Sequence, residues 1–567
     1  MRSDPSLRSG AAVCFMCLRL LSLASVSTAD GIARAATWAS TPVGPDGPWN
    51  VVKISLGRSS QSLSLFPGHQ WQILVPTSDY CSLNSSINHC DAGTYSKDKA
   101  IESKFGGIKF KTPVQHGTLG IPMAGPDLQI FYDDCDVVGP VPNCSMALVD
   151  TQMLRYPSGK LYPLFAGCLA LGAPKVNQTY TQPGQPSINA SIYPWWLQRI
   201  GTIPSSSFGM HIGSAAANAA MSGSLNFGGY DKNRIVGDIL TSKGHFTDNV
   251  QLTDVAIKSI KGKSPFDFQT KTGLLAAGNS SIPSTGINVS LDACSPYLTL
   301  PKSTCDAIAS HLPVTFNSSL GLYLWNTNDA KYKGIIGSAS ALSFSITSAG
   351  NKKPITINVP FQHLNLTLTV PLLVSDAQYF PCFTGDPGAF VLGRAFMQDV
   401  FLGASYDNSL WWLAQAPGPD IPSNPNVVNL ASSDESVSAS GTEWASTWDR
   451  VWSASASDAK PSPSPSPETS STSQFSPGLS TGEKVGIGVG VDVALLVLAA
   501  AGALFWRKTR RSKLSQESHT VSDESNSYSQ AITEAYAPKT PLAGYTAHEV
   551  PGTLVVERQQ KQPYELQ

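Results

Sequence analysis

Residues 61–76, QSLSLFPGHQWQILVP, contain two runs of alternating apolar residues on either side of a Pro-Gly dipeptide. Alternation with a period of two is typical of a half-buried β-strand, so the stretch predicts two strands joined by a turn at Pro67-Gly68. No Asp or Glu occurs from residue 47 to residue 78. The turn therefore carries no carboxylate of its own.

Strand-like runs of the same kind, such as VVKISL, LQIFY and LTLTVPLLV, dominate residues 48–416. We therefore expect this part to form one mainly β body. A helix is predicted over 302–312, with Ser303 as its N-cap. Charged residues make up only 14% of the 567 residues, and the net charge is −1, with no basic patch for nucleic acid. No Cys/His spacing indicates a metal, and no cofactor is expected.

The N-terminus predicts a secreted protein. Arg2 and Arg8 precede an apolar stretch over 11–26 that Arg19 interrupts, and Ser27-Thr28-Ala29 offers a small-residue cleavage site. This pattern predicts a signal peptide over residues 1–29, and the alternative is a short disordered leader. Glycosylation sequons begin at eight asparagines: Asn84, Asn143, Asn177, Asn189, Asn279, Asn288, Asn317 and Asn365.

Eight cysteines remain once the predicted signal peptide is removed, and an even number in a secreted chain predicts disulfide bonds. They are Cys81, Cys90, Cys135, Cys144, Cys168, Cys294, Cys305 and Cys382.

The composition changes after Pro417. Residues 417–484 are rich in Ser, Pro and Thr, with PSPSPSP at 461–467, which predicts a disordered stalk. Within it, Trp444, Trp448 and Trp452 recur every four residues and would form one face of a short helix. That face either docks back on the domain, which is the commoner case, or anchors the protein at a membrane or a wall polymer.

Residues 485–506 are apolar except for Asp492 and are long enough to cross a bilayer core of about 30 Å. A basic cluster begins at Arg507, which places the following segment in the cytoplasm. The sequence therefore predicts a single-pass type I membrane protein. Its ectodomain would be extracellular, or in the vacuolar lumen, and its tail over 507–567 cytoplasmic.

Five blocks follow one another through the globular part: ISLGRSSQSLSLF (54–66), FGGYDKNRIVGD (227–238), SLDACSPYLTLP (290–301), FVLGRAFMQDVFLGASYD (390–407) and LAQAP (413–417). In this order and spacing they resemble the pepsin-like aspartic proteases (peptidase A1), specifically the membrane-anchored forms of filamentous fungi.

The resemblance implies a bilobal, mainly β fold with lobes over 48–215 and 216–416 and a cleft between them. Each lobe of such a protein contributes one Asp-Thr-Gly loop. The two carboxylates share one proton, because they are too close to ionise together. One then activates a water while the other polarises the scissile carbonyl. The two threonines cross-bond and hold the carboxylates coplanar.

When the family's pattern is carried over to this chain, only one of the two catalytic aspartates is present. Asp292 stands at the second catalytic aspartate, and Ala-Cys replaces the Thr-Gly that follows it. Counting back from the end of the first motif puts Pro67 at the first aspartate, with Gly68 and His69 in place of Thr and Gly. Imidazole can do acid-base work, but a lone histidine beside a turn is far more often packed or solvated. The resemblance also suggests HGTLG (116–120) as the tip of the flap that closes over substrate.

The resemblance further implies two disulfide bonds, and a third joins cysteines across a short loop. Cys168 and Cys294 are left either close together or merely buried. The three expected pairs are Cys81–Cys90, Cys305–Cys382 and Cys135–Cys144.

Three functions are compatible with the sequence. The leading hypothesis is a non-catalytic pseudo-protease at the cell surface, whose cleft binds a polypeptide or a wall polymer. The first alternative is a working, membrane-tethered aspartic endopeptidase, which needs a carboxylate that the sequence does not supply. The second is a glycosylated structural or sensor protein. Binding to an intact or a blocked cleft separates the leading hypothesis from the structural one.

Overall fold

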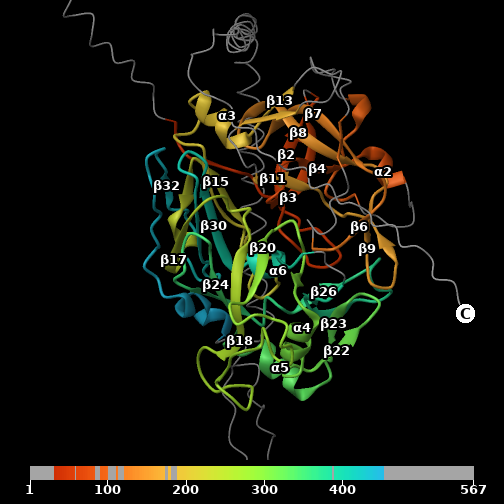
Figure 1. Ribbon diagram of the computed structural model, residues 1–567, viewed down its shortest axis with the longest axis vertical. Coiled ribbons are helices and arrows are strands. Elements are labelled where there is room, and N and C mark those ends of the chain that lie inside the picture. The colour runs from red at the N-terminus through yellow and green to blue at the C-terminus, as the bar shows by residue number, and fades with distance from the viewer. Residues whose placement is uncertain are drawn as a thin grey trace, which may run out of the picture. The chain divides into compact units, whose positions relative to one another are not determined.

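The computed structural model describes residues 31–57, 59–82, 90–99, 110–112, 120–172, 177–180, 188–385 and 389–452, which belong to one compact unit (Figure 1). The predicted signal peptide, transmembrane helix and cytoplasmic tail lie outside the described residues, as does the predicted stalk beyond residue 452. Among the helices that the structure does describe, none is long and apolar enough to cross a bilayer.

The N-terminal lobe is built on a seven-stranded sheet that includes the two strands predicted around Pro67. Alternate residues of its strands are buried, as the pattern of period two requires. In sheet order its strands are β2 (Val52–Leu56), β3 (Gln61–Gly68), β11 (Cys168–Ala170), β4 (Ile73–Pro76), β8 (Pro140–Val149), β7 (Leu128–Asp136) and β5 (Phe110–Thr112).

The C-terminal lobe is built on a second large sheet, in a different half of the unit (Figure 1). Its main path runs β25 (Ile355–Pro360), β24 (Ser340–Thr347), β18 (Val250–Ser259), β20 (Ile287–Leu291), β29 (Val391–Leu392), β21 (Leu298–Thr299) and β28 (Cys382–Phe383), with β19 (Thr270–Lys271) paired to β18. A four-stranded sheet adds β22 (Val314–Asn317), β23 (Leu322–Trp325), β27 (Ala377–Phe380) and β26 (Leu366–Leu368).

A six-stranded sheet combines strands that are distant in sequence: β1 (Arg34–Ala35), β15 (Ser224–Phe227), β14 (Ser207–His211), β30 (Val400–Ser405), β31 (Leu410–Gln415) and β17 (Val236–Lys243). Smaller sheets pair β10 (Leu161–Tyr162), β9 (Met153–Arg155) and β6 (Met123–Ala124), then β12 (Asn177–Tyr180) with β13 (Ile188–Ser191), and β16 (Gly229–Asp231) with β32 (Val427–Asn429). The described fold is therefore mainly β and bilobal, as predicted.

The helices in the described residues are short. They are α2 (Ser78–Ser82), α3 (Tyr193–Arg199), α4 (Lys302–Ala309), α5 (Ala330–Ile336) and α6 (Arg394–Met397), with 3-10 segments η1 (Lys97–Lys99), η2 (Lys232–Arg234) and η3 (Trp444–Trp448). The predicted helix is α4, but Ser303 is not its N-cap. The N-cap is Pro301, two residues earlier, so Ser303 lies in the first turn and accepts a hydrogen bond from Asn279 Nδ2 (2.9 Å).

Residues 417–452 fold onto the domain, whereas the composition predicts a disordered stalk from this point. β32 pairs with β16, and Trp448 is fully buried with its ring 4.8 Å from that of His363. Trp444 and Trp452 pack beside it. The tryptophans therefore dock back on the domain, because the apolar area they bury outweighs the polar composition around them.

Replacing Trp448 with alanine is expected to lower the free energy of unfolding by about 3–5 kcal/mol, because it removes a fully buried aromatic side chain. Urea unfolding of the purified domain measures the loss. The control is Trp71→Ala, since Trp71 is 51% exposed and its removal should cost less than about 1 kcal/mol. Equal losses of unfolding free energy in the two variants would show that burying Trp448 stabilises the domain no more than an exposed tryptophan does.

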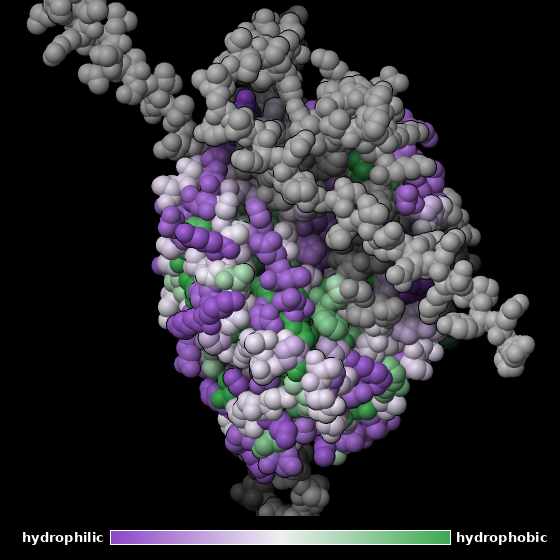
Figure 2. Space-filling view, viewed as in Figure 1, coloured by the Kyte–Doolittle hydropathy of each residue, from purple (hydrophilic) through white to green (hydrophobic). Residues whose placement is uncertain are grey.

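The large apolar side chains that remain exposed come mostly from separate elements, apart from Val370 and Val374 in one loop. Figure 2 shows hydrophilic and hydrophobic residues interspersed on the described part of the viewed face. Exposed apolar residues that are scattered in this way are normal for a folded protein and indicate no particular partner.

Candidate active site

The two large sheets repeat one arrangement of three strands. In the N-terminal lobe, β11 lies between β3 and β4, parallel to the first and antiparallel to the second. In the C-terminal lobe, β29 lies in the same way between β20 and β21. The loop that leaves β3 and the loop that leaves β20 are therefore structural counterparts, one from each lobe.

Asp292 begins the loop after β20 and is fully buried. Its Oδ1 accepts hydrogen bonds from the backbone N–H groups of Cys294 (2.9 Å) and His69 (3.2 Å). Its Oδ2 accepts one from Gln70 Nε2 (3.0 Å). Two of these three donors belong to the first lobe, so the structure brings the two loops into direct contact at the predicted aspartate.

The strand registers identify what faces Asp292 from the first lobe. Asp292 follows the last residue of β20, which pairs with the last residue of β29. In the first lobe, Pro67 of β3 pairs with Leu169 of β11. The pairs between β11 and β4 and those between β29 and β21 indicate that Pro67 is equivalent to the last residue of β20. Gly68 is thus the counterpart of Asp292, one residue after the position counted from the sequence. A Cβ there would lie 2.8 Å from Cys294 Cβ and 3.0 Å from Asp292 Oδ1, so only glycine fits.

Gln70 is the site residue that sequence reasoning missed. Its amide nitrogen lies 3.0 Å from Asp292 Oδ2, a distance at which a partner carboxyl could share a proton with the aspartate. The side chain reaches back from two residues beyond Gly68. A glutamine next to an empty catalytic position could have been noticed in the sequence as a polar group of suitable length, but its direction depends on the turn.

His69 lies beside the aspartate without bonding to it through its ring. Its Nε2 is 3.8 Å from Asp292 Oδ2, beyond hydrogen-bond range, and its side chain is 14% exposed. The contact that it does make with Asp292 comes from its backbone N–H. This geometry matches a packed histidine better than a group poised to move protons.

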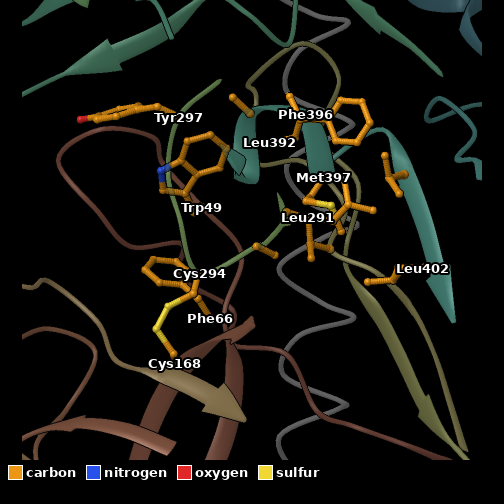
Figure 3. Packing of buried hydrophobic residues seen from close by; sticks show 14 of the residues in the cluster. Trp49, Phe66, Cys168, Leu291, Cys294, Tyr297, Leu392, Phe396, Met397 and Leu402 are labelled. Atoms are coloured by element: carbon orange, nitrogen blue, oxygen red, sulfur yellow. A yellow bond between two sulfur atoms is a disulfide. The ribbon is translucent and has the colours of Figure 1, made fainter. Parts of the chain in front are cut away.

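Cys168 and Cys294, whose pairing the sequence left open, form a disulfide bond with a Cα–Cα distance of 5.7 Å. Figure 3 shows this bond at the lobe junction, among the labelled residues Phe66 and Trp49. Both cysteines are buried. The cysteine in the place of the motif's glycine is therefore bonded to the first lobe.

Arg394, the first residue of α6, braces the second loop from behind. Its Nη1 donates to the backbone oxygen of Cys294 (2.7 Å), and its guanidinium stacks over Phe66 at 3.7 Å from the ring centroid. Its Nη2 lies 3.7 Å from Asp46 Oδ2, while Trp49 Nε1 donates to Asp46 Oδ1 (2.9 Å). Burial lowers the pKa of Arg394, and the nearby Asp46 opposes this shift.

Three tyrosines extend this buried cluster. Tyr156 and Tyr297 share a hydrogen bond between their hydroxyls (2.8 Å), and Tyr379 donates to the backbone oxygen of Asp46 (2.5 Å). Burial raises the pKa of each of the three. A cavity of about 20 Å³, large enough for one water, lies between Asp46, Arg394 and the apolar side chains around them. The contact of Arg394 with Cys294 links this cluster to the second loop, which it supports.

Two of the predicted disulfide bonds are present: Cys305–Cys382 joins α4 to β28, and Cys135–Cys144 joins β7 to β8. Cys90 is disulfide-bonded. The side chain of Cys81 lies outside the described residues, so the pair Cys81–Cys90 stays a prediction.

The predicted flap tip is described only at its last residue, Gly120, and His116 lies outside the described residues. The backbone oxygen of Gly120 accepts a hydrogen bond from Thr299 Oγ1 (3.1 Å), which places the end of this segment against the second lobe.

Two equivalent loops, one from each β-rich lobe, meeting at a buried aspartate define the class as pepsin-like. The sequence model of the family described as eukaryotic aspartyl protease matches residues 141–416. Residues 141–416 therefore contain a pepsin-like aspartyl protease domain. The matched span contains Asp292 and Arg394 but not the turn at Pro67. No curated protein matches the chain.

Proposed function

We propose that this pepsin-like domain is a pseudo-protease that binds polypeptide at the junction of its lobes without cutting it. The observation that carries the proposal is the contact between Gln70 and Asp292 at 3.0 Å. A carboxamide there can donate a hydrogen bond, but it cannot share a proton as a second carboxyl does. The aspartate is the acceptor in all three of its hydrogen bonds described above, which is the role of an ionised carboxylate.

Such a carboxylate lacks what peptide hydrolysis needs. The reaction divides its work between a base that activates water and an acid that polarises the carbonyl. Asp292 alone cannot do both in one step, and cooperating catalytic groups fail together rather than by halves. Polypeptide is the ligand that we favour, because the lobes and their junction keep the family's arrangement. A wall polymer is the alternative outcome of the test.

The test is binding of a denatured, alkylated polypeptide and, separately, of soluble β-glucan to the purified protein. We expect the polypeptide to bind and to be recovered intact by mass spectrometry. Trp71, 51% exposed and next to Gln70, should contact the ligand, so Trp71→Ala should weaken binding about tenfold. Val427→Ala, at a 42% exposed position on β32, is the control and should change nothing. Binding of β-glucan alone, or of neither, would overturn the proposal.

We further propose that the domain is a glycosylated ectodomain on a single-pass membrane protein. The support is the signal-like leader, the sequons and the basic cluster after residue 506. N-linked glycans should map only to positions before residue 420, and Asn288, whose side chain is exposed, should be modified. A C-terminal tag should stay hidden on intact cells. An accessible tag would contradict this topology.

A further inference from the structure

We propose that the Cys168–Cys294 disulfide holds the two loops of the lobe junction in register, in place of the paired threonines that the family's motif would supply. Neither threonine is present, since His69 and Ala293 occupy the relevant positions. A covalent bond between the lobes replaces a hydrogen bond between them. This inference goes beyond the proposed function, because it holds whether or not a ligand binds.

The position of each sulfur supports this role. Cys294 lies two residues after Asp292, inside the loop that leaves β20. Cys168 opens β11, where it pairs in register with Phe66 of β3 and Leu74 of β4. The bond thus joins the loop after β20 in the C-terminal lobe to β11 in the N-terminal lobe. β11 is the strand that lies between β3 and β4. It closes a sequence separation of 126 residues.

The contacts around Cys294 transmit this constraint to the aspartate. The N–H of Cys294 donates to Asp292 Oδ1 (2.9 Å), and its backbone oxygen accepts from Arg394 (2.7 Å). The close approach of Gly68, described above, presses the first loop against both Cys294 and Asp292. Because the disulfide holds Cys294 in place, it also determines the position at which Asp292 contacts Gln70.

The disulfide bond is protected from reduction by its position in the folded domain. Cys168 is fully buried and Cys294 is 4% exposed, so neither is accessible to a reductant while the domain stays folded. The disulfides Cys135–Cys144 and Cys305–Cys382 each lie within one lobe. They are matched controls, because they differ from Cys168–Cys294 in not crossing the junction.

Hydrogen–deuterium exchange on the full-length protein tests the inference. We expect Cys168→Ala/Cys294→Ala to speed exchange in peptides over 66–72 and 290–296 together, by about tenfold or more. Cys305→Ala/Cys382→Ala should speed exchange around α4 and leave 66–72 unchanged. Unchanged loops in the first variant, or the same response of 66–72 in both variants, would overturn the inference.

A second measurement applies if the first variant does not fold. Peptide mapping of the native protein without reduction should recover Cys168 linked to Cys294. A thiol reagent should label neither cysteine in the folded or the denatured protein, and should label both only when denaturant and a reductant are added together. Labelling of either residue in the folded protein would show that the lobes are not joined there.

Discussion

Replacing Arg394 with leucine is expected to destabilise the domain by about 3–5 kcal/mol, because it leaves a buried carboxylate without its counter-charge. Asp46 is only 6% exposed and its nearest cation is Arg394. The substitution also removes the donor to the backbone oxygen of Cys294, a buried acceptor next to the candidate site. Urea unfolding at neutral pH measures the loss.

A double-mutant cycle separates the charge effect from the loss of packing over Phe66. Asp46→Asn keeps the bond to Trp49 but removes the charge, so Arg394→Leu should cost less in that background than in the native one. The surface control is Arg450→Leu. Arg450 forms an ion pair with Asp420, and its side chain is 75% exposed. Loss of this ion pair should lower the free energy of unfolding by about 1 kcal/mol or less. Additive losses in the cycle would mean that Arg394 acts through packing alone.

Replacing Gln70 with glutamate is expected to make stability strongly dependent on pH. The new carboxyl would face Asp292 at about the 3.0 Å that the amide now occupies, and two carboxylates this close cannot both ionise. The pair would therefore keep a proton in the folded state that the unfolded chain releases above about pH 4. Stability would be close to native at pH 4 and would fall as the pH rises, by about 3 kcal/mol for a pKa raised by two units.

Urea unfolding at pH 4 and pH 8 measures this dependence for the native protein and the variant. Gln269→Glu, at an exposed position, controls for adding a carboxyl elsewhere and should show no such slope. A Gln70→Glu variant whose stability changes with pH no more than the control's would contradict the placement of Gln70 against Asp292. We expect no cleavage activity from this variant, because the loop also lacks the threonine and glycine of the motif.

The strands, the bilobal arrangement and two disulfides could be predicted because their signals are local or repeat a known order of blocks. The strand pattern around Pro67 and the helix α4 are examples. The position of Asp292 also followed from its block, SLDACSPYLTLP. The strands and the Cys135–Cys144 pair depend on residues that are close in sequence, whereas the bilobal arrangement and the Cys305–Cys382 pair followed from the resemblance to a known family.

The partners of these residues could not be predicted in the same way. Arg394 and Asp46 meet across most of the domain, and Cys168 meets Cys294 over 126 residues. The reach of Gln70 toward Asp292 depends on how the turn after β3 is folded. The composition after Pro417 favoured disorder, and the pairing of β32 with β16 and the packing of three tryptophans on the second lobe reverse that expectation. Each of these contacts is a property of the assembled fold.

Any assay at acidic pH needs a check that the domain is folded. Burial, with a smaller effect of Arg234, lowers the pKa of His211 to about 3. The unfolded chain takes up a proton on this histidine from about pH 6.5 downward, while the folded domain does so only near pH 3. This group therefore reduces stability as the pH falls through that window. Circular dichroism at each assay pH shows where the folded state persists.

The most direct test of the missing dyad is cleavage of a denatured protein by the purified, deglycosylated ectodomain between pH 2 and 7. Asp292→Asn and an inhibitor that mimics the tetrahedral intermediate serve as controls at every pH where the domain is folded. We predict no cleavage above the level of the Asp292→Asn control. Cleavage that disappears both in that control and with the inhibitor would show that a second carboxyl works with Asp292, and would contradict the assignment of this domain as a pseudo-protease.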